Sequence, residues 1–256
     1  LYLLGRGLTA IHPMAATRTS GRELKRLIVH QLRSEELATA LDRIRELPAR
    51  RAVNCLFSLF CDRDPLLRWR AVTAMGAVVA ALAGSEAESA RVVMRRFMWN
   101  LNEESGGIGW GCPEAMGESM ARSALLAEEF GCILTSYLWP QGNFLEFSAI
   151  QPGVLWGLGR LGYARPSAIG DCAERVHPFL SAEDAPRRGL AAWAAGAIGS
   201  AESIPPLVRL KEDVELLEFY DEGRLRRVSV GELARAALAR LQSELATMDV
   251  THEMGR

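Results

Sequence analysis

A short pattern of small and large residues recurs along this chain at intervals close to 40 residues. In each copy a small residue is followed four positions later by a large aliphatic residue or Met, and then usually by glycine. The last positions of the five copies are Gly76, Gly117, Gly162, Gly199 and Gln242, so the intervals between them are 41, 45, 37 and 43 residues. A repeat of this length is typical of a pair of antiparallel helices in a helical repeat array.

The spacing inside the pattern indicates how such helices pack. Residues i and i+4 lie on one helix face, so the small residue lets a neighbouring helix approach while the large residue fills the space beside it. The glycine is expected to end or bend the helix. Second helices are expected between these at residues 87–101, 168–180 and 201–211, with an earlier pair at 34–46 and 50–61. A single pair would expose an apolar face, so the pairs must stack into one core.

The C-terminal part of the chain departs from this helical pattern. Two runs of β-forming residues, 214–220 and 224–230, flank residues 221–223, which predicts a hairpin with a three-residue turn and a glycine bulge. Ser229 and Glu232 then match a capping box that opens the last helix.

These patterns together define the expected architecture. The fold is predicted to be all-α, a right-handed α-solenoid of five to six antiparallel helix pairs, with a short β-hairpin near residues 214–230 and a last helix at 230–245. We expect a single solenoid domain over residues 20–246. Residues 1–19 are expected to be flexible or not native to the protein, and residues 247–256 to be a flexible tail.

Composition and charge restrict the partners. The 256 residues are 49% hydrophobic and 24% charged, which is enough apolar material for a sizeable core. With 30 Lys and Arg against 31 Asp and Glu, the formal net charge is -1, which argues against binding nucleic acid or an anionic membrane by bulk electrostatics. No apolar run approaches the roughly 18 residues that cross a bilayer. We therefore expect a protein or peptide partner, and no nucleic acid or membrane.

Cysteine and histidine usage indicates the compartment and the absence of a metal. The five cysteines form no CxxC pair, which favours a reducing compartment and hence a cytoplasmic protein with mostly buried thiols. The four histidines lie far apart and match no zinc-binding spacing. We expect neither a bound metal nor a cofactor.

Three repeat segments carry a resemblance to known proteins. RWRAVTAMG, VLWGLGRLG and AAWAAGAIG resemble HEAT-like repeats of the phycobilisome-lyase type, over roughly residues 34–245. The segment WNLNEESGGIGWGCPEAMGE, Trp99 to Glu118, is similar more specifically to an uncharacterised prokaryotic family of HEAT-repeat proteins, the DVU0298 family. The resemblance implies a HEAT-like fold and leaves the activity open.

Residues 102–112 break the repeat. Four glycines within residues 106–111 are incompatible with a stable helix, because each costs about 1 kcal/mol in a helix interior. A loop is therefore expected, followed by a helix from Pro113 to about Phe130. The glycines do not match a nucleotide-binding motif, since the third glycine of GxGxxG is replaced by Cys112 and no P-loop lysine follows.

The carboxylates around this loop allow two interpretations. Glu103, Glu104, Glu114 and Glu118, with Asn100, Asn102 and loop carbonyls, supply the oxygen ligands that a hard cation such as calcium or magnesium prefers. Their spacing matches no known cation loop, so we favour a polar loop with Glu114 and Glu118 on a solvated helix face.

Cys112 also has two interpretations. A thiolate at a helix N-terminus is stabilised by the helix dipole and is often reactive. Cys112 occupies the small-residue position of the repeat, however, and no histidine is near it in sequence, so a packed structural thiol is preferred.

The tryptophans recur at nearly equivalent repeat positions. Trp156 and Trp193 lie six residues before their repeat glycines, and Trp69 and Trp110 lie seven before theirs. In a stacked array such positions form a stripe that either lines a groove or fills the core between repeats. We expect Trp110, within the loop of glycines, to be functional, with Trp99 packing beneath it.

A cluster of arginines in the second repeat is expected to form solvated ion pairs, because Glu86 and Glu88 are near. These residues are Arg63, Arg68, Arg70, Arg91, Arg95 and Arg96.

No catalytic set is assembled by these motifs, which favours a protein without enzymatic activity. The predicted function is a protein or peptide interaction module that uses a solenoid groove near the glycine-rich loop. Alternatives are an accessory or lyase-like protein that handles a cofactor such as a tetrapyrrole, and a cation-binding loop. The predicted binding residues are Trp99, Asn102, Glu103, Glu104, Ser105, Gly106, Gly107, Trp110, Glu114 and Trp156.

Overall fold

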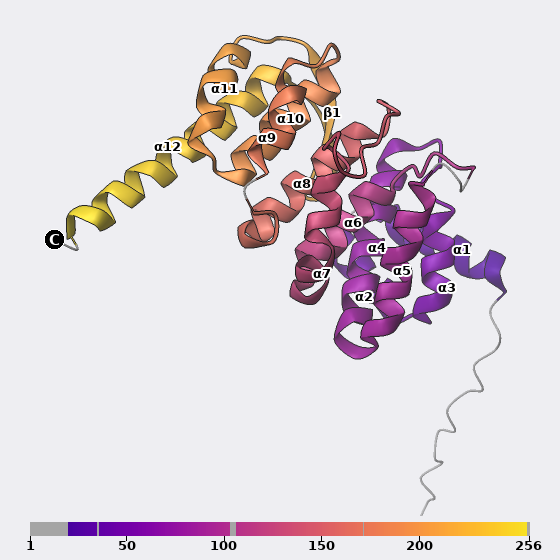
Figure 1. The fold of residues 1–256 in the computed structure, drawn as a ribbon. Coiled ribbons are helices and arrows are strands. Elements are labelled where there is room, and N and C mark those ends of the chain that lie inside the picture. Colours follow the sequence, from indigo (N-terminus) through magenta and orange to yellow (C-terminus); the bar gives the residue numbers. More distant parts are fainter. Residues whose placement is uncertain (1–19, 35, 103–105, 171, 255–256) are drawn as a thin grey trace, which may run out of the picture.

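The protein folds into stacked helix pairs with one β-hairpin (Figure 1). The structure is a computed structural model that describes residues 20–34, 36–102, 106–170 and 172–254, so the segment 1–19 lies outside it. The α-helices are α1 (Gly21–Leu32), α2 (Leu37–Arg45), α3 (Ala49–Phe57), α4 (Pro65–Ser85), α5 (Ala87–Asn100), α6 (Cys112–Arg122), α7 (Ala124–Ser136), α8 (Gln151–Ala164), α9 (Ala173–Val176), α10 (Ala185–Ile198), α11 (Ile204–Leu210) and α12 (Val230–Met254). Short 3-10 turns are η2 (Pro166–Ala168), η3 (His177–Ser181) and η4 (Ala201–Ser203), and the strands are β1 (Leu216–Asp221) and β2 (Arg224–Ser229).

Five helices form the first of two layers. α4, α6, α8, α10 and α12 pack side by side in chain order, each against the next. Helices α3, α5, α7 and α11 lie in a second layer, where α5 contacts α4 and α6, and α7 contacts α6 and α8. The five copies of the sequence pattern fall one in each first-layer helix. The structure therefore confirms a HEAT-like array of helix pairs, α3–α4 through α11–α12, preceded by α1 and α2.

Small residues at the helix crossings hold the first layer together. A methyl group added at Gly117 of α6 would overlap the Cα of Gly157 in α8, and one added at Gly196 of α10 would lie 2.8 Å from the Cβ of Ala237 in α12. Such close packing leaves no room for a larger side chain. The repeat glycines are expected to end or bend their helices: Gly199 ends α10 with a φ of 81°, whereas Gly76, Gly117 and Gly162 lie within α4, α6 and α8.

The third repeat contains two helices where the sequence predicts one. A continuous helix is expected from Pro113 to about Phe130, but α6 ends at Arg122. Ser123 has an extended backbone, and its hydroxyl accepts a hydrogen bond from the Leu126 N–H at the start of α7. Because serine favours helix caps over helix interiors, the break has a local cause.

Other boundaries also differ from the prediction. The expected helix at 168–180 is reduced to the four residues of α9 followed by η3, since Pro178 cannot donate a backbone hydrogen bond. The last helix, α12, continues to Met254, past its expected end and into the segment expected to be a flexible tail. Helix α1 begins with a capping box, in which the Ser20 hydroxyl accepts from the Glu23 N–H and the Glu23 carboxylate accepts from the Ser20 N–H.

The β-hairpin is present, but its turn is shorter than predicted. Asp221 pairs with Arg224, which leaves Glu222 and Gly223 as a two-residue turn. Both have positive φ, 46° and 81°, as a type I′ turn requires, so the expected three-residue bulge is wrong. The capping box that follows is confirmed by the hydrogen bond from the Glu232 N–H to the preceding serine hydroxyl.

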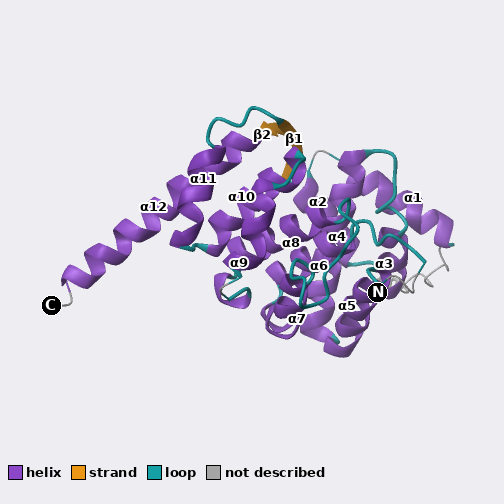
Figure 2. Cartoon of the chain, turned by 45° about the horizontal axis from the view of Figure 1, so that its top comes forward, coloured by secondary structure: helices purple, strands orange, loops and turns teal. Residues whose placement is uncertain are grey.

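The hairpin lies across one face of the first layer (Figure 2). The Phe219 ring packs edge-on against Trp193 of α10, and the Tyr220 ring stacks on Trp69 of α4 with centroids 5.0 Å apart. At the hairpin tip, Gly223 packs against Leu37 of α2. The hairpin therefore links the two ends of the helical array and covers the face between them.

Helix α4 has the length and composition of a membrane-spanning helix. Its most apolar 18-residue window has a mean hydropathy of 1.4, so the expectation that no apolar run approaches this length is wrong for Pro65–Ser85. In the structure 61% of that window is buried, and α4 contacts helices of both layers. Burial among other helices accounts for its apolar composition.

The helix crossing at Gly117 yields a test of the packing. Gly117→Ala is expected to destabilise the fold by about 3 kcal/mol or more, because the added methyl overlaps α8. The matched control is Gly84→Ala in α4, where a methyl meets nothing within 4 Å and the better helix propensity of alanine should stabilise the fold by roughly 0.5–1 kcal/mol. Urea unfolding of both variants checks this; equal effects would contradict the close crossing.

Candidate functional site

The glycines of the predicted loop are required by its backbone and by its neighbours. Gly106, Gly109 and Gly111 have φ values of 68°, 75° and 75°, a region that favours glycine. A methyl group at Gly109 would lie 2.7 Å from the carbonyl oxygen of Asn100, and one at Gly111 would lie 2.7 Å from Cγ of Phe60. The glycines thus hold the loop close against the end of α5 and the segment after α3.

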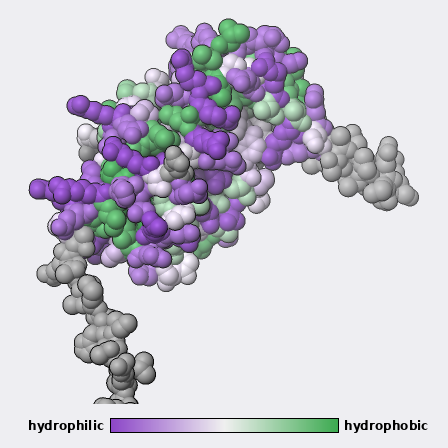
Figure 3. Space-filling model, turned by 180° about the vertical axis from the view of Figure 1, so that it is seen from behind, coloured by the Kyte–Doolittle hydropathy of each residue, from purple (hydrophilic) through white to green (hydrophobic). Residues whose placement is uncertain are grey.

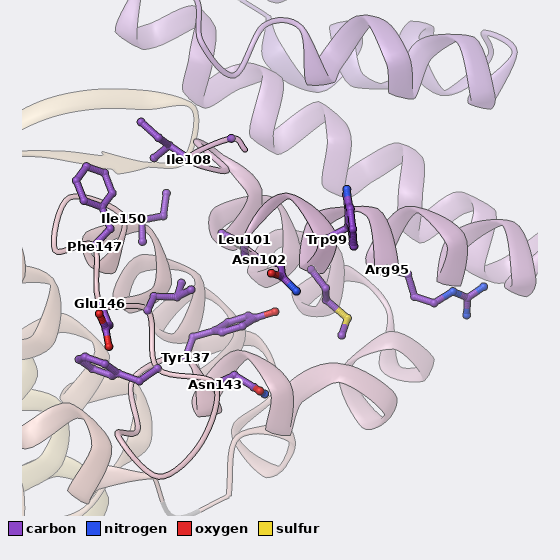
Figure 4. Close-up of a pocket in the computed structure, with 14 residues that line it drawn as sticks. Arg95, Trp99, Leu101, Asn102, Ile108, Tyr137, Asn143, Glu146, Phe147 and Ile150 are labelled. Carbon is purple, nitrogen blue, oxygen red and sulfur yellow. The ribbon is translucent and has the colours of Figure 1, made fainter. Parts of the chain in front are cut away.

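One side of the loop borders a groove of about 900 Å³ (Figure 4). We call it the loop groove; it lies between the end of α5, the loop and residues 143–150, which precede α8. Three large apolar side chains on its walls are unusually exposed: Trp99 at 56%, Ile108 at 47% and Phe147 at 53%. The Trp110 ring meets Phe147 edge-on with centroids 6.2 Å apart, so Trp110 lies beside the groove.

Polar groups are interspersed among these apolar walls. Asn102, Asn143 and Tyr137 line the groove, and the Asn143 amide donates a hydrogen bond to the Ser136 hydroxyl. Burial raises the pKa of Tyr137 to about 12, so its hydroxyl stays protonated and remains a hydrogen-bond donor. The loop groove thus combines apolar surface with neutral hydrogen-bonding groups.

A second, smaller cavity of about 340 Å³ lies on the other side of Trp110. We call it the Glu114 pocket. It is lined by Phe60, Cys61, Arg68, Trp69, Val72, Trp110, Gly111 and Glu114. Two predicted binding residues that are near each other in sequence, Trp110 of the loop and Glu114 in the first turn of α6, therefore line the same cavity.

Glu114 is a perturbed carboxylic acid in this pocket. Its Oε2 is buried and has no hydrogen-bond partner among the described residues. The carboxylate lies against α8 at Gly153, where a methyl group would come within 2.5 Å of Oε1. Burial raises the pKa of Glu114 to about 7, and its own backbone N–H and the Arg68 guanidinium offset this only in part. The prediction of a solvated helix face is therefore wrong for Glu114.

Glu118 is likewise buried, but its charge is fully paired. The Arg122 Nε donates to Oε1 at 2.6 Å, and the Arg160 Nε donates to Oε2 at 2.6 Å. The first ion pair lies within α6, and the second links α6 to α8. All three side chains line a cavity of about 610 Å³ that borders the hairpin. The solvated-face prediction is wrong here too, and both carboxylate oxygens are engaged by arginine.

Cys112 is a packed thiol, as the sequence analysis prefers. It is 2% exposed, and burial, aided by the nearby Glu114 charge, raises the pKa of its thiol. Because a raised pKa disfavours the thiolate, the geometry gives no support to a reactive cysteine at this position.

The predicted tryptophan stripe exists, but it is covered. Trp69 and Trp156 lie 4.8 Å apart between ring centroids, and Trp156 and Trp193 lie 6.1 Å apart. Trp156 is 2% exposed, and its indole N–H donates to the backbone carbonyl of Tyr220 in the hairpin at 2.9 Å. Trp156 packs in the core and also lines the cavity of about 610 Å³ beside the hairpin, so its interpretation as a binding residue stays a prediction.

The remaining predicted site residues divide into three groups. Trp99, Asn102 and Gly107 line the loop groove, and Gly106 lies in the loop beside it. Trp99 faces this groove instead of packing beneath Trp110. Three predicted residues lie outside the described part of the chain, namely Glu103, Glu104 and Ser105.

No cluster of three or more His, Cys, Asp or Glu side chains suited to a metal ion occurs within the described ranges. The carboxylate of Glu118, one of the four in the cation interpretation, is engaged by two arginines. Two others, Glu103 and Glu104, fall outside those ranges, so the cation interpretation stays a prediction.

Sequence patterns did not indicate several residues of the two cavities. Phe147, Tyr137 and Asn143 come from a segment without periodicity, although its clustered Gly, Asn and Ser residues do signal a loop. The sequence predicts that Arg68 forms a solvated ion pair, as Arg91 does with Glu129 at 2.6 Å. Arg68 instead lines the Glu114 pocket.

Comparisons with known proteins name no enzymatic activity. No family model matches the chain. An uncharacterized protein from Archaeoglobus fulgidus is 26% identical over 182 residues, which is 70% of this chain and 91% of that protein.

Among solved structures, an engineered protein of the Northeast Structural Genomics Consortium is similar, with 17% identity, coverage of 86% of this chain and 97% of that chain, and a TM-score of 0.47. A designed armadillo repeat protein in complex with the peptide (KR)4 has 16% identity, coverage of 86% and 99%, and a TM-score of 0.43. The archaeal HEAT-like repeats protein from Thermococcus onnurineus NA1 has 16% identity, coverage of 88% and 81%, and a TM-score of 0.36.

The raised pKa of Glu114 predicts how stability depends on pH. The folded protein keeps the Glu114 proton up to about pH 7, whereas the unfolded chain releases it near 4.5, so stability from this group is lost as the pH rises between these values. Glu114→Gln removes this loss. The free energy of unfolding of the variant, relative to that of the wild type, should therefore rise by up to about 3 kcal/mol between pH 4.5 and pH 8. Denaturant unfolding at both pH values measures the difference.

The exposed Glu146 provides the matched control. Glu146→Gln should change stability by less than about 0.5 kcal/mol at either pH, because the side chain is exposed. If Glu114→Gln shows the same free-energy difference from the wild type at both pH values, the Glu114 carboxyl is not perturbed as described.

Proposed function

We propose that the protein is a non-enzymatic interaction module whose loop groove binds a short extended peptide segment of a partner protein. The observation that carries this proposal is the gathering of Trp99, Ile108 and Phe147, each about half exposed, around one groove of about 900 Å³. Aromatic and aliphatic anchors of this kind dominate binding at protein interfaces.

The shape and chemistry of the groove favour a peptide. Sites of roughly 300–1,000 Å³ enclose drug-sized molecules. The groove, at about 900 Å³, is therefore large enough for several side chains of a peptide. The walls remain open to solvent, which suits a segment that is part of a larger partner. Neutral donors and acceptors from Asn102, Asn143 and Tyr137 match the polar groups of a peptide backbone.

The charge of the groove further defines the partner segment. Arg95 and Glu146 are its only charged side chains among the described lining residues, and Arg95 is paired with Glu88. A segment with apolar side chains and little net charge therefore fits better than a strongly basic or acidic one. Apolar patches also occur on the face shown in Figure 3, so the groove is set apart by the convergence of its apolar groups on one cavity.

Two assignments from the sequence accompany this proposal. The resemblance of Trp99 to Glu118 supports membership of the DVU0298 family of HEAT-repeat proteins. A cytoplasmic location is proposed because the five cysteines are free thiols in the structure, as expected in a reducing compartment.

A randomised 12-residue peptide display library, selected on the purified full chain, tests the proposed function. Selected peptides should be enriched in apolar residues and, in fluorescence polarisation, should bind Trp99→Ala and Phe147→Ala at least about tenfold more weakly than the wild type. Val214→Ala is the matched control, because Val214 is 81% exposed and does not line the groove.

Circular dichroism of each variant confirms that these surface changes leave the fold intact. The proposal fails if selection enriches no sequence, or if the selected peptides bind the groove variants and the wild type equally.

A further inference from the structure

A second ligand site, independent of the loop groove, is indicated by the Glu114 pocket. Its volume of about 340 Å³ is at the lower end of the range for small-molecule sites, which suits a ligand of amino-acid size. Its apolar walls are Phe60, Trp69, Val72 and Trp110.

The aromatic walls are held in place by contacts outside the pocket. Trp69 stacks on Tyr220 with an interplanar angle of 9°, and it also contacts Trp156. Phe60 is held by its close approach to Gly111, where no side chain larger than hydrogen fits. A pocket whose walls are already fixed loses little conformational entropy on binding a ligand.

Two groups of opposite charge in this pocket lack ordinary partners. The buried Oε2 of Glu114 accepts no hydrogen bond, and the side chain of Arg68 makes no ion pair or hydrogen bond within the part of the chain that the structure describes. Among the described residues, Arg68 and Glu114 form no ion pair with each other. Because Oε2 is closed to solvent, the Glu114 side chain must turn toward the pocket to meet a ligand, and its unpaired burial favours that turn. A bound ligand that pairs with both the Glu114 carboxylate and the Arg68 guanidinium would therefore be stabilised.

We propose that the Glu114 pocket binds a free α-amino acid with an apolar side chain. Its ammonium group would donate to the Glu114 carboxylate and its carboxylate would accept from the Arg68 guanidinium, which is suited to two-point recognition of carboxylates. Its side chain would lie against the tryptophans, whose faces also attract the ammonium group.

Ligands with one charge fit this arrangement less well. An amine without a carboxylate leaves Arg68 unpaired and is repelled by it, and a carboxylate without an amine is repelled by Glu114. The zwitterion is therefore the class that the two residues select together.

Proton release by Glu114 must accompany recognition of the ammonium group. The groups beside Glu114 are Arg68 of α4, the exposed Cys61 thiol before α4, and the buried Cys112 thiol of α6, while α8 presents the uncharged Gly153. Because the pKa of Glu114 is about 7, binding requires loss of a proton that is largely present at pH 6. The affinity should fall about tenfold from pH 8 to pH 6.

Isothermal titration calorimetry of the full chain at pH 8 tests the proposal with L-leucine, L-methionine and L-phenylalanine. At least one should bind with a sub-millimolar Kd, and 2-phenylethylamine and 3-phenylpropanoate, which each lack one charge, should bind at least about tenfold more weakly than L-phenylalanine. Glu114→Gln and Arg68→Gln should each weaken binding at least tenfold, with folding verified by circular dichroism.

Two controls separate this site from the loop groove. Arg63→Gln, an exposed arginine near the pocket, and Trp99→Ala in the loop groove should leave amino-acid affinity unchanged. The proposal is overturned if none of the three amino acids binds, if a singly charged analogue binds as tightly as L-phenylalanine, or if Glu114→Gln binds like the wild type.

Discussion

The close approach of α6 and α8 at Gly117 and Gly157 is the constraint on which the rest of the structure depends. These glycines let two first-layer helices pack without side chains between their backbones, and Gly196 with Ala237 does the same for α10 and α12. The spacing brings Trp156 within ring contact of both Trp69 and Trp193, although the three come from different helices. Helix packing through small residues therefore creates the aromatic surface on which the hairpin rests.

The hairpin determines where a partner finds open surface. Tyr220 and Phe219 pack on the tryptophan face, and the hairpin tip reaches α2, so the hairpin covers part of this side and borders the cavity of about 610 Å³ that remains there. The glycine-rich loop opens the array elsewhere, at the start of α6. Trp110 lies at the junction there, with Phe147 of the loop groove on one side and the Glu114 pocket on the other. The loop thus creates two cavities of different size and chemistry from one interruption of the repeat.

Local patterns predicted the repeated elements well, because helix periodicity, helix caps and glycine-rich turns depend on residues that are close in sequence. The five first-layer helices, the hairpin and the Ser229–Glu232 cap follow from such patterns. The site was only partly predictable: Trp110 and Glu114 were identified by their unusual segment, but their meeting with Arg68 depends on how α4 and α6 pack. The burial of Trp156 also depends on a contact with Tyr220, 64 residues away in sequence, which no local pattern reveals.

The central claim is that partners bind at the loop end of the array and not on the face that the hairpin covers. Hydrogen–deuterium exchange of the full chain, with and without a display-selected peptide, tests it most directly. The account predicts slower exchange in residues 99–102, 106–111 and 143–150, and unchanged exchange in the hairpin at 216–229. Protection centred on the hairpin and α2, with the loop and residues 143–150 unaffected, would contradict it.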